Sequence, residues 1–577
     1  MKPYFDTMDP FGKSLKPGRI KRAAASATAL REIEAGIGEA VTAAHEVGFP
    51  TEKINKRGWM TVYQRLEYLV DAGTWCPLHT LYNPLENEEG TTNVVDGVGQ
   101  IDGRWAVVIG FDNKVMAGAW LPGQSENILR ATDLAARLHI PLVWLVNCSG
   151  AKLPEQEKFY ANRRGAGTPF YRHAELEQAG IPVLAGIYGT NPAGGGYQSI
   201  SPTILLAHKD ANMAVGGVGI VSGMAPKGGF DTAMVEELIA KANEFTGRPP
   251  GDVATHHDAT GFFTRVYDEE TGVLDGLKDY MRAMPAYGST FFQAADPKDP
   301  AFPIDDLYHL LPANPKEVYD FDEILARLGD GSERLEFRPD DGPEVFTGVC
   351  KIDGRLVGCI GNRQGYLGKG YPEYADYPGM GGKLYRQGLI KMNEFVTLCG
   401  RDRLPIIWFQ DTSGIDVGEL AEKAEVLGLG QGLIYSIQQT DVPMMLVVLR
   451  KGTAAAHYVM GGPTANRHNA FSLGTPATEI EVMHGETAAV ATYARRAAKE
   501  QAAGRSLDPV IEKMNALVER YHETSRPAYC AQQGFVDEVV KLTELRRYLQ
   551  AFTGAVYQNP TSICPRHHML LPRVIRG

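Results

Sequence analysis

Two kinds of turn rich in glycine and alanine each occur twice in this sequence, and their placement indicates chemistry performed by the main chain. The first kind follows an apolar run, at Cys148–Ala151 and again at Thr412–Ile415. The second follows another apolar run, at Ala193–Tyr197 and at Ala454–Tyr458. A strand-to-helix turn leaves the first helical N–H groups without partners. Two such turns side by side give converging N–H donors for an oxygen that gains negative charge, which is an oxyanion hole.

Small side chains suit this chemistry because the oxygen must come within about 3 Å of each N–H group. The duplicated turns therefore predict two oxyanion holes in one chain, although tight turns that only pack helices against strands have the same composition. The sequence does not decide which of two neighbouring residues in the first turn supplies the N–H donor. The candidate donors are Gly150 or Ala151 with Gly195 in the first hole, and Gly414 or Ile415 with Ala456 in the second.

The sequence segments that are expected to position these turns also occur twice. GVGQIDGRWAVVIG at 97–110 aligns without a gap to GVCKIDGRLVGCIG at 348–361. IPLVWLVNCSG, which ends at Gly150, likewise matches LPIIWFQDTSG, which ends at Gly414. Strand-like and helical runs alternate along both halves, which is typical of an α/β fold. Matched blocks in the same order predict an internal duplication.

The division between the halves is predicted at a proline-rich passage near residues 295–315, because repeated proline continues neither a helix nor a strand ladder. We therefore expect an N-terminal domain over 1–305 and a C-terminal domain over 306–577. The first 60 or so residues carry good helix formers and few turn residues, so they predict a helical arm.

Composition excludes several classes of protein. Lysine and arginine number 58 against 69 aspartate and glutamate, for a net charge of -11, and no basic run suited to nucleic acid appears. No apolar stretch reaches the roughly 18–20 residues needed to cross a bilayer, and the N-terminus lacks the pattern of a signal peptide. The seven cysteines are widely separated and odd in number, so we expect reduced thiols in a cytoplasmic protein.

Further motifs resemble those of the biotin-dependent carboxyltransferases, whose fold belongs to the crotonase superfamily. The resemblance covers essentially the whole chain. It implies two tandem crotonase-like (ClpP/crotonase) domains related by duplication. The segments that carry it are NCSGAK at 147–152, NPAGGGY at 191–197, DTSGIDVG at 411–418, RKGTAAAHYVMGG at 450–462 and ATEIEVMHGETAA at 477–489.

This resemblance implies a transfer of the carboxyl group of glutaconyl-CoA to protein-bound biotin, which gives crotonyl-CoA and carboxybiotin. The N-terminal domain is then the acyl-CoA side, and the C-terminal domain is the biotin side. The same transfer from methylmalonyl-CoA or a methylcrotonyl-type ester is an alternative within the family. Two functions outside the carboxyltransferases also stay open: a crotonase-like hydratase or thioesterase, which would use only one hole, and a non-enzymatic scaffold.

The resemblance also implies partners. We expect at least a homodimer with the active site at its interface, a biotin carrier protein and a membrane-bound decarboxylase subunit, which would hold this cytoplasmic chain at the membrane peripherally. Biotin is expected on the separate carrier, because neither Lys391 nor Lys513 stands in the Ala-Met-Lys-Met setting of a biotinylated lysine. No metal and no nucleotide redox cofactor are predicted.

Residues beside the turns are candidates for binding. Basic residues after the first turn suit the phosphates of CoA, although the solvated end of a helix is commonly basic too. His457 is a candidate for shaping the biotin pocket. Pairs of histidines near residues 256 and 567 lack the spacing of metal ligands. The binding candidates are Lys152, Arg163, Arg164, Gly194, Gly196, Ala455 and His457.

Overall fold

The computed structural model describes residues 8–160, 164–198, 204–222, 230–259, 262–283, 295–339, 341–368 and 378–558. The chain forms two compact units. The N-terminal unit comprises Val41–Ser289 and Ala555–Gly577, and the C-terminal unit comprises Thr290–Gly554 and Met1–Ala40. The first 40 residues therefore pack with the second half of the chain. Helices α1 (Pro17–Glu46) and α19 (Leu545–Gln558) contribute residues to both units.

The N-terminal unit is built on a seven-stranded sheet with the order β10-β8-β6-β5-β4-β3-β2. Strands β2, β3 and β4 pair antiparallel, and every pair from β4 to β10 is parallel. A small parallel pair, β7 (Thr190–Pro192) and β9 (Asn212–Ala214), lies outside this sheet. The strands of the main sheet are β2 (Cys76–Leu78), β3 (Val94–Ile101), β4 (Arg104–Phe111), β5 (Leu142–Val146), β6 (Val183–Ile187), β8 (Ile204–His208) and β10 (Arg265–Tyr267).

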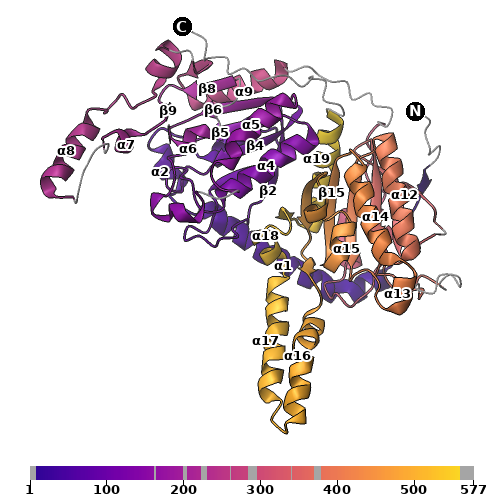
Figure 1. The fold of residues 1–577 in the computed structure, drawn as a ribbon. Helices are drawn as coiled ribbons and strands as arrows, with labels where there is room; N and C mark the ends of the chain where they lie inside the picture. Colours follow the sequence, from indigo (N-terminus) through magenta and orange to yellow (C-terminus); the bar gives the residue numbers. More distant parts are fainter. Residues whose placement is uncertain are drawn as a thin grey trace. The chain divides into compact units, whose positions relative to one another are not determined.

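Helices cover both faces of this sheet, and this explains why its central strands are continuous apolar runs (Figure 1). Every residue of β5 is buried. One face packs against α3 and α9 in a shared core that includes Leu66, Val143 and Leu274. The helices of this unit are α2 (Thr51–Asn55), α3 (Val62–Leu69), α4 (Gln124–Leu138), α5 (Thr168–Gln178), α6 (Gly194–Tyr197), α7 (Val218–Ser222), α8 (Thr232–Asn243) and α9 (Glu270–Ala283).

The sheet of the C-terminal unit repeats this plan. Its order is β1-β11-β12-β13-β14-β15-β16-β18, and β17 pairs with the end of β15. Strands β11 to β13 pair antiparallel, and the pairs from β13 to β18 are parallel, as in the N-terminal unit. The strands are β1 (Asp9–Pro10), β11 (Glu333–Glu336), β12 (Val345–Ile352), β13 (Arg355–Asn362), β14 (Ile406–Thr412), β15 (Met444–Thr453), β16 (Asn469–Gly474), β17 (Glu479–Glu481) and β18 (Glu538–Val539).

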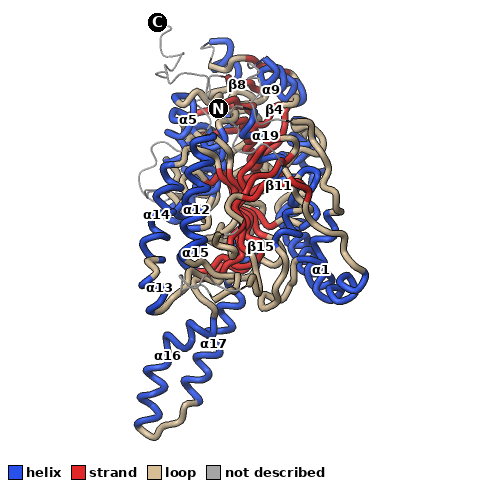
Figure 2. Tube along the Cα trace, turned by 90° about the vertical axis from the view of Figure 1, so that its right-hand side faces the viewer, coloured by secondary structure: helices blue, strands red, loops and turns tan. Residues whose placement is uncertain are grey.

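Two long helices of the C-terminal unit, α16 and α17, form a hairpin that projects away from its sheet (Figure 2). Among the described residues, no helix is both long enough and apolar enough to cross a membrane. The helices of this unit are α10 (Leu307–Leu310), α11 (Phe321–Leu325), α12 (Arg386–Asp402), α13 (Glu419–Lys423), α14 (Val426–Gln439), α15 (Ala454–Val459), α16 (Gly485–Ala502), α17 (Asp508–Thr524) and α18 (Pro527–Gln532).

The repeated Ile-Asp-Gly-Arg segment forms the same hairpin turn in both units. In the N-terminal unit, Ile101 pairs with Arg104 across a turn in which Asp102 and Gly103 have φ of 51° and 76°. In the C-terminal unit, the corresponding φ angles of Asp353 and Gly354 are 53° and 75°. A two-residue turn with two positive φ angles matches the right-handed twist of the strands and favours Asp-Gly. Turn geometry therefore explains the Asp-Gly part of this sequence identity.

The two hairpin glycines predict different costs of substitution. Both have positive φ, so alanine costs about 1–2 kcal/mol at either site. A Cβ atom at Gly354 would also lie 2.0 Å from the Ala295 carbonyl oxygen, whereas nothing lies within 4 Å of a Cβ at Gly103. We expect Gly354→Ala to lower the urea midpoint of the C-terminal unit more than Gly103→Ala lowers that of the N-terminal unit. Equal shifts would contradict the turn geometry.

Candidate active site

The first turn of the N-terminal unit presents one unpaired main-chain donor. After β5 the chain reaches Gly150 in the left-handed region, with φ of 100°. The Trp120 N–H group donates to the Gly150 carbonyl at 2.8 Å, and the Lys152 N–H group donates to the Trp120 carbonyl at 3.0 Å. The Ala151 N–H group between these two bonds has no acceptor among the described residues. The turn is thereby fixed while one donor is left for a ligand.

The second turn lies directly against the first. Ala193 has φ of 48° and starts the short helix α6, which has no side-chain cap. A Cβ atom at Gly195 would lie only 2.4 Å from the Cys148 carbonyl oxygen, so glycine is required for this contact. Within the described part of the chain, the Gly195 N–H group also has no acceptor. Two predicted donor turns are therefore adjacent in the folded chain.

In the C-terminal unit, two corresponding hydrogen bonds hold the first turn. The Leu384 N–H group donates to the Gly414 carbonyl at 3.0 Å, and the Asp416 N–H group donates to the Leu384 carbonyl at 3.0 Å. Of the residues described, none accepts a hydrogen bond from the Ile415 N–H group, which lies between them. Gly414 has φ of 140°, so the turn again requires glycine at this point.

The second turn of this unit begins at Ala454, whose φ of 52° matches that of Ala193 in the N-terminal unit. Ala456, two residues later in α15, is fully buried. Its N–H group has no acceptor in the part of the chain that the structure describes. Among the described residues, both turns of each unit thus contain an unpaired main-chain donor.

A buried amide side chain, not found from the sequence, holds these turns in each unit. Asn191 accepts a hydrogen bond from the Cys148 N–H group at 2.7 Å and donates to the Tyr188 carbonyl at 2.9 Å. Gln410 donates to the His457 carbonyl at 3.3 Å and contacts the His457 Nδ1 atom at 2.7 Å. The sequence could have indicated these two residues, because each is a polar amide among apolar or small residues. A buried amide needs hydrogen-bond partners, and so holds neighbouring parts of the chain.

Comparisons with known proteins identify the family. The pattern that defines the carboxyl transferase domain matches residues 53–571. The glutaconyl-CoA decarboxylase subunit alpha of Acidaminococcus fermentans is 56% identical over 577 residues, which cover 99% of this chain and 97% of that protein. This chain belongs to the carboxyl transferase family.

Other carboxyl transferases resemble the chain more distantly. The methylmalonyl-CoA decarboxylase subunit alpha of Propionigenium modestum is 23% identical over 513 residues, covering 87% of this chain and 91% of that one. The beta subunit of P. aeruginosa geranyl-CoA carboxylase aligns with a TM-score of 0.75 and 22% identity, and the alignment covers 97% of this chain and 98% of that chain. This structural likeness shows the α/β carboxyltransferase fold that the sequence indicates.

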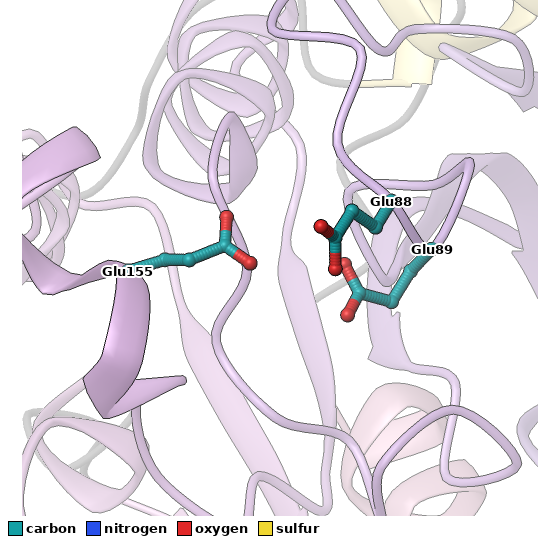
Figure 3. Close-up of side chains that lie close together, drawn as sticks. All are labelled: Glu88, Glu89 and Glu155. Carbon is teal, nitrogen blue, oxygen red and sulfur yellow. The ribbon is translucent and has the colours of Figure 1, made fainter.

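Lys152 of this carboxyl transferase is surrounded by carboxylates. Its ammonium group forms ion pairs with Glu89 and Glu155 and lies 3.7 Å from Glu88. Hydrogen bonds from the ammonium group to Glu155 and Glu89 raise the pKa of Lys152. The three glutamates converge on one point (Figure 3), and the Lys152 ammonium group pairs with them there, so the described cluster is an ion-pair network. A role for Lys152 in binding CoA stays a prediction.

The other binding candidates of the N-terminal unit are held in different ways. Arg164 makes a two-pronged contact with Glu126, at 2.7 and 2.8 Å, and Arg163 lies outside the described residues. A Cβ atom at Gly194 would make ordinary contact with Trp120 at 3.4 Å, whereas one at Gly196 would overlap Met213 at 2.7 Å. Close packing therefore requires glycine at 196 more strictly than at 194.

His457 and Ala455 flank Ala456 in the first turn of α15. Burial lowers the pKa of His457 to about 4, so its ring is neutral at physiological pH. Because the Gln410 amide nitrogen faces main-chain carbonyls, its oxygen is the atom that accepts the proton of His457 Nδ1. The histidine is thus a neutral donor inside the unit.

Among the described residues, the nucleophilic groups beside the N-terminal donors are already engaged: the Ser149 hydroxyl of the first turn donates to the Met116 carbonyl at 2.7 Å. Cys148 is fully buried, and burial raises the pKa of its thiol to about 12. The His256 ring contacts the Met213 carbonyl, and His257 contacts Asp258; the histidines at 567 and 568 lie outside the described residues. The chemistry available to this site is stabilisation of charge by main-chain N–H groups.

The buried state of His457 predicts a pH dependence of stability. Its folded pKa of about 4 lies below the unfolded value of 6.5, so the neutral ring stabilises the fold fully above pH 6.5. This stability is lost as pH falls toward 4, by about 2–3 kcal/mol at pH 4.5. We expect the urea midpoint of the C-terminal unit to fall less between pH 7 and pH 4.5 in His457→Asn than in the unaltered chain. Equal falls would show that His457 does not titrate in this way.

Proposed function

We propose that this chain is the carboxyltransferase subunit of a glutaconyl-CoA decarboxylase, which moves the carboxyl group of glutaconyl-CoA to biotin carried on another protein. The observation that carries this proposal is the 56% identity to the A. fermentans subunit over 99% of the chain. The two pairs of unpaired N–H groups support it, since a transfer between two carbonyl compounds develops negative charge on two oxygens.

In the N-terminal unit, the N–H groups of Ala151 and Gly195 are proposed to hold the thioester oxygen of glutaconyl-CoA. When the bond between the γ-carbon and the carboxyl group breaks, its electron pair forms a dienolate whose charge reaches this oxygen. Donors that are already in position stabilise this charge more than that of the bound ester, and therefore accelerate the reaction. Ala151 is preferred over Gly150 as the donor because its N–H group lacks an acceptor among the described residues.

In the C-terminal unit, the N–H groups of Ile415 and Ala456 are proposed to hold the ureido oxygen of biotin, the carboxyl acceptor. Their unpaired donors suit an oxygen that gains charge as the neighbouring nitrogen loses its proton. That proton passes to the dienolate, which becomes crotonyl-CoA, while the nitrogen forms a bond to the carboxyl carbon and gives carboxybiotin. No acid or base from the protein is required for this balance.

We also propose that the two units are tandem crotonase-like domains related by internal duplication, with functional boundaries at 1–305 and 306–577. Seven strands of each sheet follow the same order with the same parallel and antiparallel pairings, whereas, among the described residues, β1 and β17 occur only in the C-terminal sheet. The bonds that hold Gly150 and Gly414 have the same pattern. These correspondences support a common origin for the two donor sites.

We further propose a homo-oligomer, at least a dimer, whose active site lies at its interface and which works with a biotin carrier protein and a membrane decarboxylase subunit. The A. fermentans relative is named as a subunit, which supports a multi-subunit enzyme. Helix α8 supports self-association, because it has no buried residue although Val235 and Ile239 lie on it and are exposed. Apolar side chains of this kind are commonly covered in an assembly.

This association predicts a molar mass in solution of at least about twice 63.0 kDa. Replacing both Val235 and Ile239 by glutamate introduces charge at the proposed contact and should shift the mass toward that of one chain. Light scattering after size-exclusion chromatography measures this. If the double variant keeps the molar mass of the unaltered chain, α8 does not lie at the interface.

The proposed activity is tested by the formation of crotonyl-CoA from glutaconyl-CoA by the purified chain, with and without free biotin as the carboxyl acceptor. We expect crotonyl-CoA formation that depends on biotin. If methylmalonyl-CoA or a methylcrotonyl-type ester were used in preference, the substrate assignment would be wrong but the transfer would stand. Hydration or thioester hydrolysis without biotin would instead indicate a crotonase-like hydratase or thioesterase.

Gly195→Ala tests the proposed N-terminal donor in the same assay. The added Cβ atom would lie 2.4 Å from the Cys148 carbonyl oxygen, so the two turns must separate. Loss of one such donor lowers kcat by about 100-fold or more. Gly167→Ala is the matched control, because nothing lies within 4 Å of its Cβ position, and its kcat should stay within about twofold. A Gly195→Ala enzyme with full turnover would refute the site.

A further inference from the structure

The two donor pairs are held by different amides at positions that do not correspond. Cys148 aligns with Thr412, so the position of Gln410 corresponds to Val146 in the N-terminal unit. Gly195 aligns with Ala456, so the position of Asn191 corresponds to Gly452 in the C-terminal unit. Both amides are fully buried. The Gln410 amide extends from the strand before the first turn of its unit, whereas the Asn191 amide extends from the strand before the second turn of its unit, where the Gln198 amide also contacts Cys148 at 3.5 Å.

Gln410 links the strand that carries one donor to the helix that carries the other. It stands in β14, which leads into the turn of Ile415. Its amide nitrogen faces the carbonyl oxygens of Ala456 and His457 at 3.4 and 3.3 Å, and its oxygen contacts His457 Nδ1 at 2.7 Å. A Cβ atom at Gly452 would lie 2.9 Å from this oxygen, so glycine there leaves room for the amide.

Asn191 makes the corresponding link in the N-terminal unit. It stands in β7, just before Ala193 and the helix that carries Gly195. Its oxygen accepts the Cys148 N–H group at 2.7 Å, three residues before Ala151. Its nitrogen donates to the carbonyls of Tyr188 and Asn212, at 2.9 and 3.1 Å. The amide therefore joins the first turn to the strands that support the second.

We propose that Gln410 and Asn191 are positioning residues, which set the spacing between the two N–H donors of the biotin-side hole and of the acyl-CoA-side hole respectively. This inference rests on the proposed function. A donor pair stabilises an oxyanion only when both N–H groups lie about 2.7–3.1 Å from it. A misplacement of about 1 Å can lower the rate by about 100-fold.

Gln410 can be replaced without removing every bond of the helix it holds. The Ala456 carbonyl also accepts the Met460 N–H group at 3.0 Å, and the His457 carbonyl accepts that of Gly462 at 3.0 Å. Loss of the amide therefore leaves α15 intact but released from β14. We expect Gln410→Leu to lower kcat for biotin-dependent crotonyl-CoA formation by about 10- to 100-fold, with an unchanged KM for glutaconyl-CoA.

Two further variants make this test specific. Gln410→Glu keeps the volume and the acceptor for His457 but loses the donor, so its kcat should fall similarly. Gln438→Leu is the matched control, because Gln438 also donates to a main-chain carbonyl, that of Ala465, away from the two turns. Its kcat should stay within about twofold. A merely structural role for Gln410 would lower thermal stability and leave kcat per folded chain unchanged.

Asn191 is tested in the same way. Asn191→Leu should lower kcat while the KM for biotin is unchanged, because the altered spacing lies on the acyl-CoA side. Asn113→Leu is its control, since Asn113 likewise accepts one main-chain N–H group, of Val62, and donates to the carbonyl of Met60. Unaltered kcat in both Gln410→Leu and Asn191→Leu would overturn the inference while leaving the proposed function in place.

A measurement other than activity distinguishes failure of the proposed function from failure of the positioning role of Gln410. Hydrogen exchange measured by mass spectrometry should become faster in residues 454–460 of Gln410→Leu, and should not change there in Gln438→Leu. If the unaltered chain forms no crotonyl-CoA in the presence of biotin, the proposed function fails. The exchange result still decides whether Gln410 holds α15, and unchanged exchange refutes it.

Discussion

The structure depends on one constraint, which is that two turns must touch closely while their N–H groups stay unpaired. Unpaired main-chain donors inside a protein are costly. The surrounding chain therefore satisfies the neighbours of each donor, as Trp120 does for Gly150 and Lys152. The close approach of Gly195 to Cys148 allows no side chain between the turns. The parallel sheets, the residues with left-handed backbone conformation and the buried amides together hold the two turns in contact.

The two units meet this constraint in different electrostatic surroundings. Beside the N-terminal donors, Lys152 lies in a network of glutamates. Beside the C-terminal donors, His457 is neutral, and Val417 and Leu427 are largely exposed. The donors of the two units therefore have different neighbours, although the turns that carry them repeat.

The sequence predicted the features that arise from local chemistry. The Asp-Gly turns, the apolar parallel strands and the small-residue turns each follow from a few neighbouring residues. The packing of the first 40 residues with the C-terminal unit was not predicted, because helical composition does not specify which surface a helix covers. The roles of Asn191 and Gln410 also escaped prediction, since their partners are 43 and 47 positions away. Lys152 likewise meets Glu89 only through folding.

The measurement that tests the central claim most directly is the infrared stretching frequency of the thioester carbonyl of bound crotonyl-CoA, with that carbon labelled by 13C. Two short N–H hydrogen bonds would polarise the carbonyl group. We expect a frequency below that of crotonyl-CoA in water, and a return toward the water value in Gly195→Ala. A bound carbonyl with the same frequency as in water would show that the two N–H groups do not form an oxyanion hole.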